Sequence, residues 1–252
     1  MIWKFIDTGF NPGKFNMDYD LQLVKNFSSC PVLRFYRWKP YCISLGANQN
    51  EESINTQKAA DDGIDIVKRP TGGRAILHAE ELTYSVVFPI SENYSPKKIY
   101  HEINLALRDG LINYNSTLTD LELEHTQPHF PSFYKNEKSA LCFAVSAMNE
   151  LNYEGKKVVG SAQRKIGNVI LQHGSILCGS FHKRVVEYLN MNSENIELLK
   201  TEIYETTTEL ESILGAEVNY HLLSQTIKKG FENHFDISFE DKIFSEEVLQ
   251  VN

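Results

Sequence analysis

The sequence predicts an α/β protein whose strands and helices share one hydrophobic core. Two observations are compatible with this class: short runs rich in β-branched residues are separated by turn residues, and a later stretch carries apolar residues at every fourth position. The chain has 252 residues, of which 42% are hydrophobic, so it can bury a large core. We expect one main domain over residues 1–190 and a small helical C-terminal extension, residues 191–252, packed on the same domain.

The overall charge and the absence of long apolar runs exclude several classes of protein. The formal net charge of −8 argues against a dedicated nucleic-acid binder, which needs a strongly basic face. No apolar run approaches the roughly 20 residues that cross a bilayer, and the N-terminus lacks the layout of a signal peptide. We expect a cytoplasmic protein with neither a nucleic-acid nor a membrane partner, and we expect a monomer.

The cysteines predict neither disulfides nor a zinc site. They are widely spaced and form no C-x-x-C pair. The four are Cys30, Cys42, Cys142 and Cys178. No metal is expected.

The first part of the chain predicts alternating strands and helices. A strand at Ile2–Ile6 precedes a helix that Asn16 is expected to cap, and Asp20 in the first turn of that helix offsets its dipole. Its apolar residues share one face: Met17, Leu21 and Val24.

Two further strands, Val32–Trp38 and Cys42–Leu45, are predicted to form a hairpin that turns at Lys39-Pro40. Residues 51–62 predict a polar helix that ends at Gly63, because glycine adopts positive φ readily. Strands are also expected at Ile64–Val67 and Thr83–Phe88.

The second half predicts one clear amphipathic helix that begins at Ser95-Pro96. Its apolar residues recur every fourth position: Ile99, Ile103, Leu107 and Leu111. Residues 124–140 hold two prolines and little periodicity, which predicts a mobile surface loop, and a strand is expected at Met148–Tyr153.

Beyond Gly179 the pattern becomes helical. A capping box, Thr206-x-x-Glu209, predicts the start of a short helix that Gly215 ends. A longer helix is expected to turn four apolar residues inward: Leu222, Leu223, Ile227 and Phe231.

The central candidate site is the turn between the strands at Ile64–Val67 and Thr83–Phe88. Its adjacent glycines, Gly72 and Gly73, let a ligand approach the main chain, while Arg69 and Arg74 bring fixed positive charge to the same place. This pattern favours a site for an anionic or flat ligand. An ordinary hairpin with solvated arginines is the alternative.

Two long segments together resemble the biotin/lipoate protein ligase family. The first, from Arg69-Pro70-Thr71-Gly72-Gly73-Arg74 through His78 to Glu81-Leu82-Thr83-Tyr84-Ser85, is similar to the signature R-R-P-T-G-G-R-A-x-L-H…E-L-T-Y-S. The second, from Lys157 through Gly160-Ser161-Ala162-Gln163 to Leu171-Gln172-His173-Gly174-Ser175, is similar to K-x-x-G-S-A-Q…L-Q-H-G-S-I-L. The resemblance implies a mixed, largely antiparallel sheet flanked by helices, and a catalytic domain over residues 1–190.

Within the family, Leu141-Cys142-Phe143 resembles the nucleophile segment of the cysteine-dependent octanoyl-[acyl-carrier-protein]:protein N-octanoyltransferases. The resemblance implies that Cys142 takes an octanoyl group from octanoyl-acyl carrier protein and passes it to a lysine of a lipoyl domain. The expected acceptors are the lipoyl domains of 2-oxoacid dehydrogenase E2 or glycine cleavage H protein. No cofactor is expected.

The resemblance also implies roles for individual residues. Lys157 would be the catalytic lysine that orients the acyl carbonyl, and the main chain around Ser161 would add hydrogen-bond donors. The remaining expected substrate-binding residues are Arg69, Gly72, Gly73, Arg74, His78, Tyr84, Gly160, Ala162 and His173. For His78 and His173, a base or ligand contact and a structural role both remain open.

The sequence departs from the family pattern at two places, and three alternative functions remain open. Lys68 replaces a usual arginine, and Ala144–Met148 lacks the aspartate and aromatic residues expected beside the nucleophile. The alternatives are an ATP-dependent lipoate or octanoate ligase, which would need ATP and Mg, an octanoyl amidotransferase between lipoyl domains, and a non-catalytic binding module.

Overall fold

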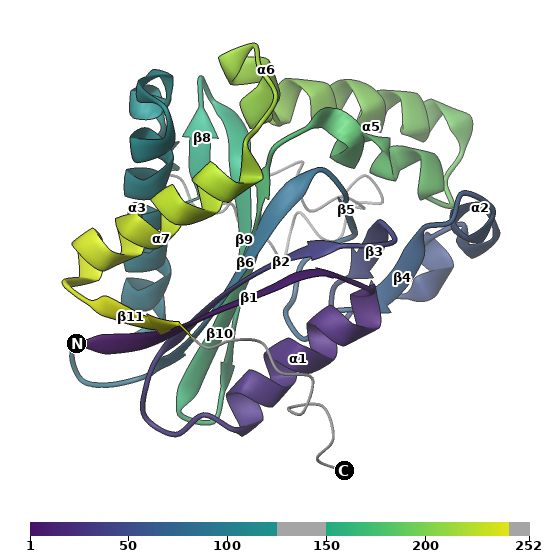
Figure 1. Ribbon diagram of the computed structural model, residues 1–252. Coiled ribbons are helices and arrows are strands. Elements are labelled where there is room, and N and C mark those ends of the chain that lie inside the picture. Colours follow the sequence, from purple (N-terminus) through teal and green to yellow (C-terminus); the bar gives the residue numbers. More distant parts are fainter. Residues whose placement is uncertain (125–149, 242–252) are drawn as a thin grey trace.

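One large mixed sheet forms the centre of the protein. The computed structural model describes residues 1–124 and 150–241. Over these residues, eight strands pair in the order β11-β1-β2-β6-β10-β9-β8-β7 (Figure 1). Their bounds are β1 Ile2–Asn11, β2 Val32–Trp38, β6 Glu81–Pro89, β7 Glu122–Leu123, β8 Leu151–Tyr153, β9 Lys156–Ile166, β10 Val169–Leu177 and β11 Ser238–Asp241. Strand β1 runs parallel to β2 and β11, whereas the other pairs are antiparallel, which confirms the expected sheet.

A small sheet of order β4-β3-β5 adjoins the large one. Its strands are β3 Cys42–Leu45, β4 Asp65–Lys68 and β5 Ile76–His78. The predicted hairpin is therefore wrong, because β2 pairs with β1 and β6 in the large sheet while β3 pairs with β4 and β5. Both strands are buried on both faces, so their sequences carry no alternation that could identify their partners.

Helices cover both faces of the large sheet (Figure 1). The helices and 3-10 turns are α1 Gly13–Lys25, η1 Glu51–Ser53, α2 Thr56–Asp61, α3 Pro96–Tyr114, η2 Ser116–Asp120, η3 Ser180–Tyr188, α5 Ser193–Thr206, α6 Leu210–Leu214 and α7 Tyr220–Phe235. Successive side chains of a strand point to opposite faces. On β6, Val86 therefore packs with residues of α3 and α7, whereas Val87 packs with Tyr19 of α1.

Three helix signals in the sequence are confirmed. Ser95 accepts a hydrogen bond from the Lys98 N–H at the start of α3, and the four apolar residues expected on that helix are buried. Gly63 and Gly215 have φ values of +68° and +65°, the left-handed conformation that suits a helix end.

Several local predictions about helices are wrong. Helix α1 begins at Gly13, so Asn16 lies inside it, where its amide donates to the carbonyls of Asn11 and Arg37. Thr206 ends α5, and α6 follows Glu209 with no side-chain cap. The predicted helix over 51–62 is η1 followed by the short α2.

Two apolar residues expected inside are exposed, and strand β11 was not predicted. Leu21 is 42% exposed and Leu222 is 43% exposed, whereas Leu223, Ile227 and Phe231 are buried. Residues 191–241, the described part of the C-terminal extension, form three helices and also β11, which extends the large sheet beside β1. The predicted loop over 124–140 lies outside the described residues except for residue 124, as do positions 148 and 149 of the predicted strand.

No helix in the two described ranges is long and apolar enough to cross a membrane.

Helices α3 and α7 pack closely because glycines face each other where they cross. A Cβ atom on Gly230 would meet the carbonyl oxygen of Ala106 and lie 2.5 Å from the backbone nitrogen of Gly110. We predict that Gly230→Ala lowers the free energy of unfolding by about 1–3 kcal/mol in urea denaturation, because the helices must move apart. Leu222→Ala, on the exposed face of the same helix, is the control and changes it by less than about 0.5 kcal/mol. Equal stability of the two variants would contradict the close packing.

Candidate active site

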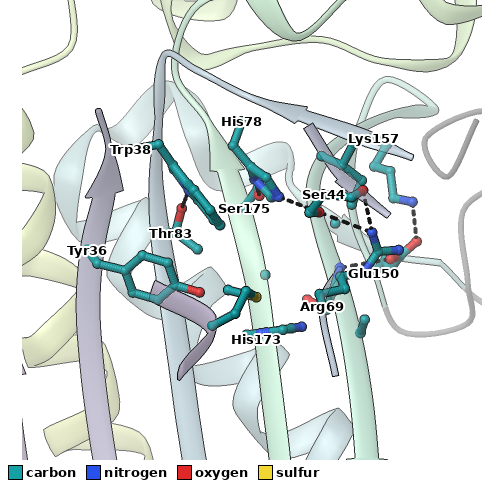
Figure 2. Close-up of a pocket in the computed structure, with 16 residues that line it drawn as sticks. Tyr36, Trp38, Ser44, Arg69, His78, Thr83, Glu150, Lys157, His173 and Ser175 are labelled. Carbon is teal, nitrogen blue, oxygen red and sulfur yellow. Dashed lines mark hydrogen bonds and ion pairs between the residues drawn. The ribbon is translucent and has the colours of Figure 1, made fainter. Parts of the chain in front are cut away.

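A cavity opens where α1, β2 and the small sheet meet β6, β9 and β10 (Figure 2). It holds about 440 Å³ of empty space, the solvent at its mouth included. Its lining residues are Met17, Tyr36, Trp38, Ser44, Arg69, Ile76, His78, Thr83, Glu150, Lys157, Gly160, Ser161, Ala162, His173, Gly174 and Ser175. Apolar and ionisable side chains thus line the same cavity.

The structure brings together seven of the residues that the sequence singled out. Those that line the cavity are Arg69, His78, Lys157, Gly160, Ser161, Ala162 and His173. Gly72, Gly73 and Arg74 do not line it. Tyr84 is fully buried, and its hydroxyl lies 2.7 Å from Ser161 Oγ. Cys142 lies outside the described residues.

Arg69 shapes the glycine loop. The side chain is 3% exposed, and its Nη2 donates to the carbonyl oxygens of Gly72 at 2.9 Å and Arg74 at 2.8 Å. Its Nη1 donates to the carbonyl oxygen of Ser44 at 2.9 Å and to Ser44 Oγ at 3.1 Å. The guanidinium therefore links the glycine loop to β3 through hydrogen bonds, and it also brings positive charge to the cavity.

Lys157 is held in the wall by Glu150. The Lys157 Nζ atom lies 2.8 Å from Glu150 Oε2, and both side chains are 3% exposed (Figure 2). The Ser161 N–H, which we expected as a free donor beside the acyl group, instead donates to Glu150 Oε1 at 3.0 Å. A buried ammonium needs such a partner because an uncompensated charge in the interior is costly.

Glu150 could not be identified from the sequence as the partner of Lys157, because it lies in no recognisable motif. On the other side, the Thr208 N–H donates to the Lys157 carbonyl oxygen at 3.0 Å, so the segment between α5 and α6 also fixes this residue.

His78 belongs to a hydrogen-bonded chain of three side chains. Its Nε2 lies 2.7 Å from Ser44 Oγ, and its Nδ1 lies 2.9 Å from Glu81 Oε1. Its ring stacks on Trp38 with centroids 4.1 Å apart. Burial alone would raise the pKa of Glu81, but His78 and two neighbouring hydroxyl groups lower it, so the carboxylate is charged at neutral pH.

His173 belongs to a second chain of the same kind. Its Nδ1 lies 3.2 Å from Asp20 Oδ2, and its Nε2 lies 2.7 Å from Thr71 Oγ1 in the glycine loop. Asp20 lies inside α1 rather than in its first turn, and it forms an ion pair of 2.7 Å with Arg34 instead of offsetting the helix dipole. Burial lowers the pKa of His173, and Asp20 offsets part of that effect.

Residues 12–232 match the family described as the lipoyl protein ligase A/B catalytic domain. The chain belongs to this family. Among curated members, the octanoyltransferase LipM of Macrococcus caseolyticus is 33% identical over 256 residues, which cover 98% of this chain and 92% of the relative. The LipM octanoyltransferases of Staphylococcus aureus and Bacillus subtilis are each 32% identical over 255 residues, covering 98% of this chain and 92% and 91% of the relatives.

Solved structures of lipoyl protein ligases share the fold. A bi-partite lipoate protein ligase from Thermoplasma acidophilum superposes with a TM-score of 0.77 at 19% identity, covering 99% of this chain and 89% of the other. A lipoate-protein ligase A bound with ATP superposes with a TM-score of 0.76 at 19% identity, covering 99% and 92%. At this identity the likeness shows the fold alone.

The described ranges contain no group of three or more histidine, cysteine, aspartate or glutamate side chains that could hold a metal ion.

We predict strong coupling between Lys157 and Glu150. Lys157→Met or Glu150→Gln alone lowers the free energy of unfolding by about 3–5 kcal/mol, because each removes one charge of a buried ion pair. The double variant loses less than the sum of the two in urea denaturation. Lys200→Met removes an exposed ion pair with Glu197 and leaves stability unchanged. Additive losses at Lys157 and Glu150 would contradict the ion pair.

We also predict that Asp20 makes stability depend on acid pH. Burial opposes its charge, but Arg34 and His173 lower its pKa below the ordinary value. A group whose pKa falls on folding stabilises the protein above its unfolded pKa, about 3.9, and that contribution disappears as pH falls through the folded value.

Wild-type stability should therefore fall below about pH 4, whereas Asp20→Asn is already less stable at pH 7 and depends less on pH in this range. Thermal denaturation from pH 2 to pH 7 measures both. Asp18→Asn, on the exposed side of α1, is the control. An unchanged pH dependence in Asp20→Asn would contradict the assignment.

Proposed function

We propose that this protein moves an octanoyl group from octanoyl-acyl carrier protein, through a thioester on Cys142, to a lysine of a lipoyl domain. The protein is an acyltransferase of the octanoyltransferase class, since full-length curated relatives with that activity are 32–33% identical to it. The observation that supports the proposal is the cavity, which Lys157 lines together with the apolar side chains of Met17, Trp38 and Ile76.

The first half-reaction is an exchange between thioesters. The Cys142 thiolate attacks the carbonyl carbon of the carrier-bound octanoyl group, the new C–S bond forms, and the carrier thiolate leaves. Exchange between thioesters is nearly thermoneutral, so no ATP is needed. A fixed ammonium such as Lys157 stabilises the oxyanion that develops on the carbonyl oxygen.

The apolar residues of the cavity suit the octanoyl chain. Each buried methylene contributes about 0.8 kcal/mol to binding. Trp38 and Met17 are almost fully buried and belong to one apolar cluster that borders the cavity. We assign the hydrocarbon chain to this side and the carbonyl group to the side of Lys157.

The second half-reaction transfers the octanoyl group to a lysine ε-amine of a lipoyl domain, in E2 of a 2-oxoacid dehydrogenase or in glycine cleavage H protein. Amide formation makes this step favourable. We also propose that the enzyme needs no cofactor, is cytoplasmic and is a monomer.

The test is the intact mass of the protein after mixing with octanoyl-acyl carrier protein. We predict a single octanoyl adduct on the wild type, its absence from Cys142→Ser, and its loss when a lipoyl domain is added. Cys30→Ser is the control, because Cys30 is another free thiol that is not fully buried, and it should load as the wild type does.

The ligase alternative gives a different result in the same experiment. If the carrier gives no adduct, while octanoate with ATP and Mg modifies a lipoyl domain even in Cys142→Ser, the thioester mechanism is wrong and the protein is a ligase.

A further inference from the structure

Ser44, His78 and Glu81 form a chain of hydrogen bonds. Ser44 and His78, at its hydroxyl end, line the cavity (Figure 2). Distances of 2.7 Å from Ser44 Oγ to Nε2 and 2.9 Å from Nδ1 to Glu81 Oε1 are ordinary hydrogen-bond lengths. Serine, imidazole and carboxylate in this order form an arrangement that can move a proton.

The neighbours of the chain fix the direction of its hydrogen bonds. Arg69 donates to Ser44 Oγ, so the Ser44 hydroxyl proton is free to point at His78 Nε2. A charged Glu81 only accepts, so His78 carries its proton on Nδ1 and presents a lone pair on Nε2. Stacking on Trp38 keeps the ring in this plane.

The carboxylates distinguish His78 from the similar His173. Asp20, the partner of His173, already neutralises the buried guanidinium of Arg34 at 2.7 Å. Among the described residues, the bonds to the Glu81 carboxylate come from His78 and from two hydroxyl groups, those of Thr83 and Ser175. When His78 takes up a proton, it forms a buried ion pair with Glu81. When His173 takes up a proton, it must share the Asp20 carboxylate with Arg34.

The two half-reactions differ in their need for a proton acceptor. In the exchange between thioesters, the proton lost by Cys142 returns to the carrier thiolate. In the second step a lysine enters as an ammonium, with an ordinary pKa near 10.4, and leaves as an amide, so its nitrogen loses two protons: one to solvent before it attacks, and one to a base as the amide forms. The second step is the one that needs a base.

We propose that Ser44 and His78 accept this proton during transfer to the lipoyl lysine, with Glu81 holding the imidazole in place. The inference rests on the proposed function. The amine nitrogen bonds to the thioester carbon and the C–S bond to Cys142 breaks. The neutral amine, which has already lost one proton to solvent, gives its second proton to Ser44 Oγ as the Ser44 proton moves to His78 Nε2. The proton held by the imidazolium balances the one that the Cys142 thiolate takes up to become a thiol again, so the step releases one proton overall.

Charged and titratable groups surround His78 on several elements. Glu81 on β6 bonds it directly, and His173 on β10 and Arg69 after β4 line the same cavity. Lys157 and Glu150 line the same cavity and form an ion pair. Of these groups, Glu81 is the one that bonds the His78 ring directly.

The test separates the two half-reactions. Wild type, Ser44→Ala and His78→Gln are loaded with octanoyl-acyl carrier protein, the adduct is quantified by intact mass, and a lipoyl domain is then added across a range of pH. We expect all three to load alike and both variants to discharge about 100-fold more slowly, since a positioned base contributes about 10²–10⁴-fold. The fall of the wild-type discharge rate at acid pH should be flattened in His78→Gln.

His234→Gln is the matched control, because His234 pairs with Glu102 at 2.7 Å outside the cavity. It should load and discharge as the wild type does. Equal losses of loading and discharge in Ser44→Ala and His78→Gln, or an unchanged discharge rate or pH profile, would overturn the inference. If His78→Gln fails to fold, the loading and discharge rates of Ser44→Ala test the inference. A wild type that never loads refutes the proposed function and this inference with it.

Discussion

The Arg34 side chain is fully buried. The candidate site depends on how the protein compensates the positive charge of this guanidinium. Each of its five N–H groups donates a hydrogen bond, to Thr8, Asn16 or Asp20. The guanidinium also lies over the ring of Tyr36, 4.0 Å from its centroid. A buried ion pair is tolerated only when its remaining donors are satisfied in this way. This requirement fixes α1 against β1 and β2.

The same ion pair organises one wall of the cavity. Asp20 also accepts from Ser85 at 2.7 Å and lies 3.2 Å from His173, which in turn bonds Thr71 of the glycine loop. A continuous polar network therefore runs from α1 through β6 and β10 to the loop. On the other wall, Glu150 fixes Lys157. Groups held by such networks need little reorganisation when charge develops on a substrate, which is the condition for electrostatic catalysis.

Local sequence signals predicted those parts of the fold whose cause is local. The amphipathic spacing from Ile99 to Leu111 identified α3, and Gly63 and Gly215 identified helix ends, because a buried stripe or a positive φ is encoded within a few residues. The partners of β2 and β3 could not be predicted, since both faces of each strand are buried. Asn16 resembled an N-cap residue because it is polar and precedes an apolar stripe. The sequence pattern is the same whether such a residue faces solvent or a buried guanidinium.

The candidate site was predictable as two motifs but not as a set of contacts. Resemblance singled out Lys157, His78 and His173, and the structure brings them to one cavity. It did not predict Glu150 as the partner of Lys157, nor the bond between Ser44 and His78, which are 34 residues apart. Such contacts depend on how β3, β5 and β9 are placed in space, and no local pattern encodes that placement.

The most direct test of this account is a crystal structure of the protein loaded with an octanoyl group from its carrier. We predict that the hydrocarbon chain lies in the cavity beside Met17 and Trp38, with the acyl carbonyl oxygen within hydrogen-bond distance of Lys157 Nζ. An octanoyl chain bound outside this cavity, or a carbonyl group far from Lys157, would contradict it.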